Sequence, residues 1–170
     1  MLRLEPVKTH RSRLGMTLPT LLTRDHRECD ELLSNALGHA QAGRWAEAES
    51  SFSQFCDRVE AHFGAEESIL FVRFEQATGM THGPTAVMRS EHEAVREALD
   101  RINDAILERD ANAVFGEGDA LFILLQQHNL KEENILYPAA ERAAGGDAAS
   151  LEADMREAIT DPASTAHRRQ

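Results

Sequence analysis

Four histidines and two glutamates occur in this chain as two copies of one pattern. Each residue of the first copy recurs 66 positions later, so that His26, His62 and Glu66 correspond to His92, His128 and Glu132. Imidazole nitrogens and carboxylate oxygens together suit iron, zinc or manganese. Because both copies have the same composition, the pattern predicts a twofold-symmetric site for two metal ions.

The repeat extends beyond these six residues. The segment 62–71, with the sequence HFGAEESILF, aligns with the segment 128–137, with the sequence HNLKEENILY. Around the first histidine of each copy, apolar residues also fall at matching positions, namely Leu22, Cys29 and Leu33 in one copy and Met88, Val95 and Leu99 in the other. The chain therefore contains two copies of one structural unit.

The elements that must position these residues are helices. Apolar residues recur at spacings of three and four along almost the whole chain, and no segment shows the sustained alternation of a strand. Glycines, prolines and polar clusters divide the pattern into long helices at about 19–43, 45–78, 84–109 and 112–142, and a short fifth helix at about 150–159. Long helices with short connections pack as antiparallel neighbours, so we expect an all-α, up-down-up-down four-helix bundle of two repeated hairpins.

The bundle divides the chain into three parts. We expect an N-terminal arm at 1–18, the bundle at 19–144, and a short helix with a polar tail at 145–170. Within the bundle, the repeats are 19–78 and 84–144, and the segment between them contains two glycines and ends at a proline.

Two of the helices carry a ready pair of ligands. Residues four apart lie on one helix face, so His62 with Glu66, and His128 with Glu132, can each hold an ion. The glutamates come from opposite hairpins, so each can bridge two ions and reduce the repulsion between them. We expect His26 and His62 to bind one ion and the other two histidines to bind the second.

A single one of these histidines could be a core residue that binds no metal, but this explanation does not suit all six residues together. A single histidine on an apolar helix face is more often a hydrogen-bonded core residue than a ligand. Four inward imidazoles and two inward carboxylates, however, would be costly to bury unless they were paired, protonated or bound to metal. Cys29 offers no second sulfur nearby, which disfavours a closed structural zinc site.

The ordered motifs of this chain resemble the hemerythrin-like, HHE cation-binding family. They are His26, the His62/Glu66 pair, the Gly-Pro84 turn followed by His92, and the His128/Glu132 pair with its Glu-Asn-Ile-Leu-Tyr-Pro138 continuation. The resemblance covers roughly residues 18–142. It implies a non-haem di-iron centre in a four-helix bundle, bridged by the two carboxylates and an oxo or hydroxo group, with zinc or manganese as lesser alternatives.

Two comparisons refine this resemblance. Ferritin-like di-iron bundles use Glu-x-x-His pairs, and none of the four histidines here has a glutamate three residues before it. The oxygen-carrying hemerythrins have a fifth histidine one turn from the position of His92, where this chain has Met88 and Arg96. We therefore expect at least one coordination position to remain for water or a small ligand.

The residues around the six ligands have separate expectations. Glu67 and Glu133 are turned about 100° from the neighbouring ligand glutamates, which favours roles behind the ligands or in surface ion pairs. We expect Tyr137, whose counterpart is Phe71, to be a core residue, with a hydrogen-bond donor to the metals as the alternative. We expect Asp25 and Glu91, which precede ligand histidines, to face solvent.

The four remaining histidines are not expected to bind metal. His39 is about 20 Å along its helix from His26, which is too far to share the site. His10 and His167 lie in the terminal segments, and we expect them to be solvated. His82 lies in the segment between the repeats, where an ordinary loop residue is expected over a role near the bundle mouth.

Composition limits the possible partners and the compartment. The net charge of −11 argues against a nucleic-acid or anionic-membrane surface, although four basic residues gather within 3–13. Neither a membrane span nor a signal peptide is expected, so we predict a cytoplasmic protein with no nucleic-acid or membrane partner. Two cysteines, Cys29 and Cys56, are too few for a disulfide framework, and we expect both to be reduced packing residues.

The sequence thus predicts a di-iron protein that binds or senses oxygen, nitric oxide or peroxide, with a role in redox or iron stress. One alternative is a di-iron enzyme with catalase-like activity, nitric-oxide chemistry or iron-centre repair. Another is an interaction module whose fold and partner binding depend on iron. A dinuclear zinc hydrolase fits the ligand types less well.

Overall fold

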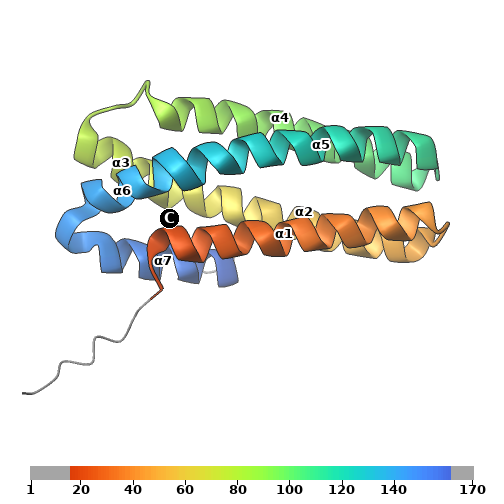
Figure 1. Cartoon of the computed structure of the whole chain (residues 1–170), viewed down its shortest axis with the longest axis horizontal. Coiled ribbons are helices and arrows are strands. Elements are labelled where there is room, and N and C mark those ends of the chain that lie inside the picture. The colour runs from red at the N-terminus through yellow and green to blue at the C-terminus, as the bar shows by residue number, and fades with distance from the viewer. Residues whose placement is uncertain (1–15, 162–170) are drawn as a thin grey trace, which may run out of the picture.

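Helices make up nearly all of the described part of the chain, residues 16–161 of this computed structural model, which contains no strand (Figure 1). The four predicted long helices begin at Leu18, Trp45, Pro84 and Ala111, and a fifth follows them. The all-α prediction is therefore confirmed. Their bounds are α1 Leu18–Gln41, α2 Trp45–Ala65, α3 Phe71–Thr78, α4 Pro84–Leu107, α5 Ala111–Lys131, α6 Tyr137–Ala144 and α7 Ala148–Thr160.

The second and fourth long helices are each interrupted by one wide π-helical turn. These turns are η1, Glu66–Leu70, and η2, Glu132–Leu136, and each starts at a ligand-type glutamate. In η2 the backbone N–H of Tyr137 donates to the carbonyl of Glu132, five residues back. Such turns are often found at functional sites.

The sequence repeat is a structural repeat. The bounds of α1, α2, η1 and α3 each recur 66 residues later in α4, α5, η2 and α6. The two copies start differently, since the Thr17 hydroxyl accepts the N–H of Thr20 at 3.3 Å, whereas Gly83 precedes α4 without a side-chain cap. Gly79, with φ of 72°, ends the first copy in a left-handed conformation that favours glycine.

The helices pack as a bundle in which the polar residues lie between two apolar cores. α1 packs along α2 and α5, and α4 packs along α5 and α2. One core surrounds Phe52, Phe55 and Ile102, and the other surrounds Leu22, Phe71 and the α7 residue Met155. On α1, His26 lies between Leu22 of one core and Cys29 of the other. The histidine layer is therefore held from both sides by packed apolar side chains.

The π turns correct part of the predicted inner face. An α-helical period places Ile135, three residues after Glu132, on the inner face, but its side chain is 60% exposed, and its counterpart Ile69 is only half-buried. Each wide turn adds a residue to the helix, so the buried stripe moves to the two residues that follow. In the second copy these are Leu136 and Tyr137, and both are buried.

Other predicted boundaries differ only slightly from the structure. α1 ends at Gln41 rather than near Gly43, and the fifth helix is α7, Ala148–Thr160, rather than 150–159. The predictions for residues 1–15, including His10, and for His167 lie outside the described residues. Within residues 16–161, no helix has the length and apolar character needed to span a membrane.

Candidate metal centre

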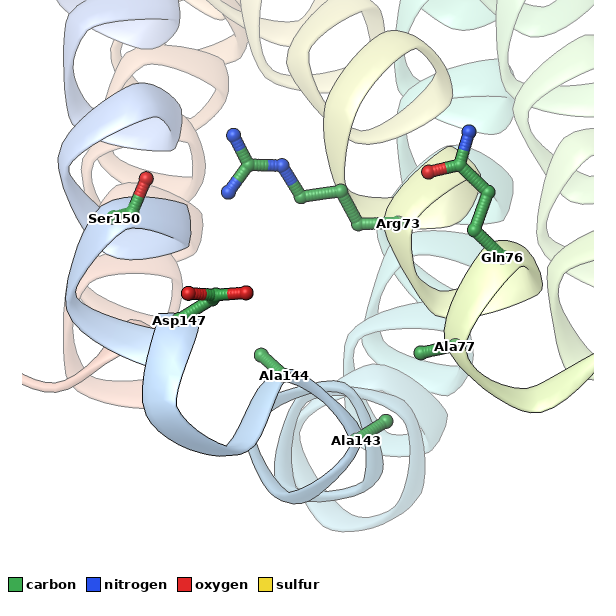
Figure 2. Close-up of a pocket in the computed structure, with 7 residues that line it drawn as sticks. All are labelled: Arg73, Gln76, Ala77, Ala143, Ala144, Asp147 and Ser150. Atoms are coloured by element: carbon green, nitrogen blue, oxygen red, sulfur yellow. The ribbon is translucent and has the colours of Figure 1, made fainter.

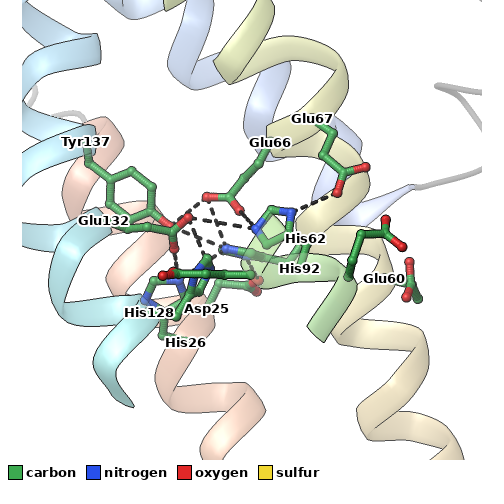
Figure 3. Close-up of polar contacts among 12 residues, drawn as sticks. Asp25, His26, Glu60, His62, Glu66, Glu67, His92, His128, Glu132 and Tyr137 are labelled. Atoms are coloured by element: carbon green, nitrogen blue, oxygen red, sulfur yellow. Dashed lines mark hydrogen bonds and ion pairs between the residues drawn. The ribbon is translucent and has the colours of Figure 1, made fainter. Parts of the chain in front are cut away.

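The six predicted ligand residues meet in one buried layer of the bundle (Figure 3). The least buried of them, His26, is 6% exposed, and both glutamates are fully buried. Their side chains come from α1, α2, η1, α4, α5 and η2, so all four long helices contribute. They form two groups with donor atoms close enough to hold an ion, which we call half-site A, containing His26 and His62, and half-site B, containing His92 and His128.

Half-site A brings two imidazoles and two carboxylates together. The Nε2 atoms of His26 and His62 are 3.2 Å apart. Glu132 Oε2 is 3.3 Å from Nε2 of His26, and Glu66 Oε1 is 3.4 Å from Nε2 of His62. All four atoms therefore surround one small space.

Half-site B uses the other oxygen of each carboxylate. Glu66 Oε2 lies 3.3 Å from Nε2 of His92, and Glu132 Oε1 lies 3.2 Å from Nε2 of His128. Glu132 Oε1 is also 4.0 Å from Nε2 of His92. Each glutamate thus directs one oxygen to each half-site, which is the arrangement of a carboxylate bridge between two ions.

All four histidines are oriented by a carboxylate on Nδ1, which leaves Nε2 directed inward. Nδ1 of His26 lies 2.8 Å from Glu133, and Nδ1 of His92 lies 2.8 Å from Glu67. These contacts agree with the expectation that the two glutamates stand behind the ligands. Metal-bound histidines characteristically donate their other N–H to a carboxylate in this way.

The expectation that Asp25 and Glu91 face solvent was wrong. Asp25 is 2% exposed and accepts from His62 Nδ1 at 2.7 Å, while Glu91 is half-buried and lies 3.0 Å from Nδ1 of His128. Both acidic residues face the neighbouring helix of their own hairpin. Each precedes a ligand histidine in the sequence but orients the histidine of the next helix.

Basic residues hold three of these outer carboxylates. Arg58 pairs with Asp25, and Lys131 pairs with Glu91. Arg96 lies 3.0 Å from Glu67 and, through its Nε, 3.0 Å from Glu60. These contacts add further order behind the histidines.

The charged side chains of the centre strongly shift one another's pKa values. Burial favours neutral His62, but the charges of Glu66 and Asp25 outweigh it and raise the histidine pKa well above its usual value. Burial likewise opposes ionised Glu66, yet His62 and His92 hold its pKa well below the usual range. The pKa of Glu132 is also lowered, because His128 and His26 outweigh both burial and the charge of Glu66. The carboxylates are therefore ionised and ready to bind a cation.

Four buried atoms of the centre have no hydrogen-bond partner. They are Glu66 Oε2, Glu132 Oε1, His92 Nε2 and His128 Nε2, the four donor atoms of half-site B. They lie near one another, but their alignment is too poor for hydrogen bonds. Unsatisfied buried polar atoms are costly. A cation bound by all four would remove this cost, so the donor set fits a metal ion.

The sequence predicted that Tyr137 is a core-packing residue. Its side chain is buried, but it also has a polar role in the centre. Its side chain is fully buried, and its hydroxyl donates toward Glu66 Oε1 at 2.7 Å and Glu132 Oε2 at 2.8 Å. Burial and then the charges of these two glutamates raise the pKa of the phenol well above its usual value. The π turn explains why α-helical periodicity missed this residue. It returns Tyr137 to the side of Glu132, whereas an α-helix would turn it about 140° away.

A small cavity adjoins half-site A. It has a volume of about 20 Å³, and its lining combines the two histidines with mainly apolar neighbours, namely Cys29, Val59, Phe63 and Leu125. A polar cavity of about 170 Å³ shares His26, Asp30 and Asn129 with it and also includes Gln126 and Glu133. The residues that line the polar cavity come from α1, α5 and η2, so this cavity lies between these elements beside half-site A.

The corresponding side of half-site B is filled. The ring of Phe63 stacks on His92 with 3.7 Å between centroids, and Arg96 lies over Phe63 at 5.6 Å. The repeat counterparts of Phe63 and Arg96 are Asn129 and Asp30, which line the polar cavity at half-site A. The two copies thus match in their ligands but differ in what surrounds them.

The other chemical groups lie away from this layer. His39 contacts Arg44 near the end of α1, and His82 is an exposed residue of the segment between α3 and α4. Both cysteines are free. A larger cavity of about 550 Å³ between α3, α6 and α7 is lined by Arg73 and Asp147, but it contains none of the six residues (Figure 2).

The fold and the buried layer define an all-helical protein with a histidine and carboxylate centre suited to metal. The family model for the hemerythrin HHE cation-binding domain matches residues 17–140. The chain therefore belongs to this family, as the sequence motifs predicted. Neither the curated proteins nor the solved structures contain a match to the chain. The family and the buried cluster together indicate that the protein binds metal, with iron favoured.

Proposed function

We propose that this protein holds two iron ions and binds a molecule of diatomic or peroxide size at half-site A. The arrangement of the two glutamates carries the dinuclear assignment, since each directs one oxygen to each pair of imidazoles. His26 and His62 hold one ion, His92 and His128 hold the other, and Glu66 and Glu132 bridge them. The ions would supply the redox and Lewis-acid chemistry.

The cavity beside His26 and His62 supports a small ligand. Its volume of about 20 Å³ exceeds the roughly 10–15 Å³ that one water needs but leaves no room for a larger organic substrate. Its mainly apolar walls favour oxygen, nitric oxide or peroxide over an ion. The adjoining polar cavity provides a route from the surface past Asp30 and Asn129.

The experiment is to load the protein with iron and record absorption spectra in air, after reduction, and with nitric oxide or peroxide. Ligand-dependent changes are expected at two irons per chain. Cys29→Leu should fill the cavity and weaken nitric-oxide binding without loss of iron. Val95→Leu, at the repeat counterpart of Cys29, is the matched control and should bind as the wild type does. Unchanged binding in Cys29→Leu would contradict the assignment to this cavity.

Asp30 favours a second candidate, an enzyme that turns over peroxide. Its carboxyl lies at the junction of the two cavities, and burial raises its pKa despite the hydrogen bond from Gln126 at 3.1 Å. A carboxyl of raised pKa can give a proton to a bound peroxide and take it back. Catalase-like turnover that falls in Asp30→Asn with iron content unchanged would support this function, whereas ligand binding without turnover would support the binding protein.

A further inference from the structure

The hydroxyl of Tyr137 lies among the donor atoms of half-site A (Figure 3). Besides the two carboxylate oxygens at 2.7 and 2.8 Å, it is 3.0 Å from His26 Nε2 and 3.4 Å from His62 Nε2. One oxygen atom therefore contacts all four atoms proposed to hold this ion.

These separations match those between neighbouring ligands of one ion. Two donors at right angles, each about 2.1 Å from a metal, lie about 3.0 Å apart. The phenol oxygen has this relationship to all four donors, and the two histidine nitrogens have it to each other at 3.2 Å. The phenol oxygen of Tyr137 therefore lies where it could join the other four atoms as a fifth ligand.

A bound cation would satisfy this arrangement better than the phenol proton alone. When metal is bound the imidazoles must be neutral, and since each Nδ1 is directed to an outer carboxylate, the proton stays on Nδ1 and both Nε2 atoms are then acceptors. The carboxylate oxygens are acceptors as well. A phenol has one proton, so it can fully satisfy only one of its four neighbours, whereas a bound cation would satisfy all four together.

The repeat places no such oxygen at half-site B. The counterpart of Tyr137 is Phe71, whose ring stacks near His92 with 5.6 Å between centroids. Half-site A therefore has five candidate protein donors, and half-site B has four. The symmetry of the six ligands does not extend to this position.

We propose that the phenol oxygen of Tyr137 is the fifth protein ligand of the iron at half-site A, which makes the two irons chemically unequal. This proposal rests on the dinuclear iron function proposed above. On binding of a ferric ion, an oxygen–iron bond would replace the O–H bond of Tyr137, and the proton would pass to solvent. The positive charge would oppose the field of the two glutamates, which otherwise keeps the phenol protonated.

Tyr137 also lies across half-site A from the small cavity. On the same long helix, Leu125 of the cavity lies three residues before His128, whereas Tyr137 lies nine residues after it. These two residues are therefore separated by about 18 Å along the helix axis, on opposite sides of the histidine layer. A phenolate there would donate electron density to a bound ion and favour its ferric state, while the cavity on the other side of the layer would admit the small ligand.

The test uses resonance Raman and visible absorption of the full chain loaded with ferrous ammonium sulfate and oxidised in air. Tyr137 is the only tyrosine of the chain, so any iron-bound tyrosinate signal is assigned without ambiguity. The wild type should show a tyrosinate-to-iron absorption band and tyrosinate ring modes. Tyr137→Phe should lose both, and Phe71→Tyr should strengthen the band by giving half-site B the same oxygen.

Iron content measured on the same samples separates this proposal from the proposed function. Two irons without a tyrosinate signal would overturn the ligand assignment and leave the dinuclear function standing. One iron with the signal would support the ligand and contradict the dinuclear function. Absence of bound iron would contradict both. The wild-type spectrum alone decides the ligand assignment if Tyr137→Phe does not fold.

Discussion

Asp25 accepts a hydrogen bond from Nδ1 of His62 at 2.7 Å, although in the sequence it stands beside His26. The carboxylate fixes the ring so that Nε2 points into half-site A. We predict that Asp25→Asn lowers iron affinity by about 10- to 100-fold, as for other carboxylates that orient ligand histidines. Iron titration against a competing chelator measures the change.

The control for Asp25→Asn is Glu28→Gln. Glu28 also pairs with Arg58 but makes no contact with a ligand histidine, and it is exposed. Its replacement should leave iron affinity within about twofold, since exposed ion pairs contribute little. Equal losses in both variants would show that the Arg58 pairs, rather than the orientation of His62, control iron binding.

The stability of the iron-free protein should be highest between the ordinary pKa values of its buried acids and histidines. Glu66 and Glu132 have pKa values lowered from 4.5, so their contribution is present above that pH and lost as the pH falls. The four histidines have pKa values raised from 6.5, so their contribution is complete below that pH and lost as the pH rises.

Bound iron should offset the loss of stability that the iron-free protein shows as the pH rises. Its ligands must be neutral imidazoles, so protons compete with metal. We therefore predict that iron loading raises Tm by a larger amount at about pH 8 than at about pH 5. Calorimetric scans of both forms check this, and a rise in Tm that is independent of pH would contradict ligation by these histidines.

Both thiols should react slowly in the folded protein. Burial, followed by nearby acidic charges, raises the pKa of Cys29 and of Cys56 to about 12. Only roughly one thiol in ten thousand is then ionised at about pH 8. Ellman's reagent should label both residues quickly in guanidinium chloride and at least about 100-fold more slowly without it. Fast labelling of either in native buffer would point to a reactive cysteine.

The sequence anticipated the repeat and the inner faces because both depend on helical periodicity. His26, Cys29 and Leu33 of α1 are buried as their spacing predicts. The same periodicity misplaced Ile135 and underrated Tyr137, since the π turn changes the number of residues per turn at one site. Nothing in the local apolar pattern signals that change.

The outer carboxylates were only partly predictable. Glu67 and Glu133 were expected behind the ligands from their angle to neighbouring glutamates. Asp25 and Glu91 were missed because their partners lie on another helix, and the pairing depends on how the hairpin helices face each other. The repeat contained a usable signal, since acidic residues precede the first histidine of both copies.

The metal content of the purified protein decides whether the centre holds two iron ions. Protein expressed without added metals and measured by plasma mass spectrometry should contain two iron ions per chain. Glu132→Gln, which removes one bridging carboxylate, should contain fewer. Two zinc ions with no iron, or a single ion per chain in the wild type, would contradict the di-iron centre.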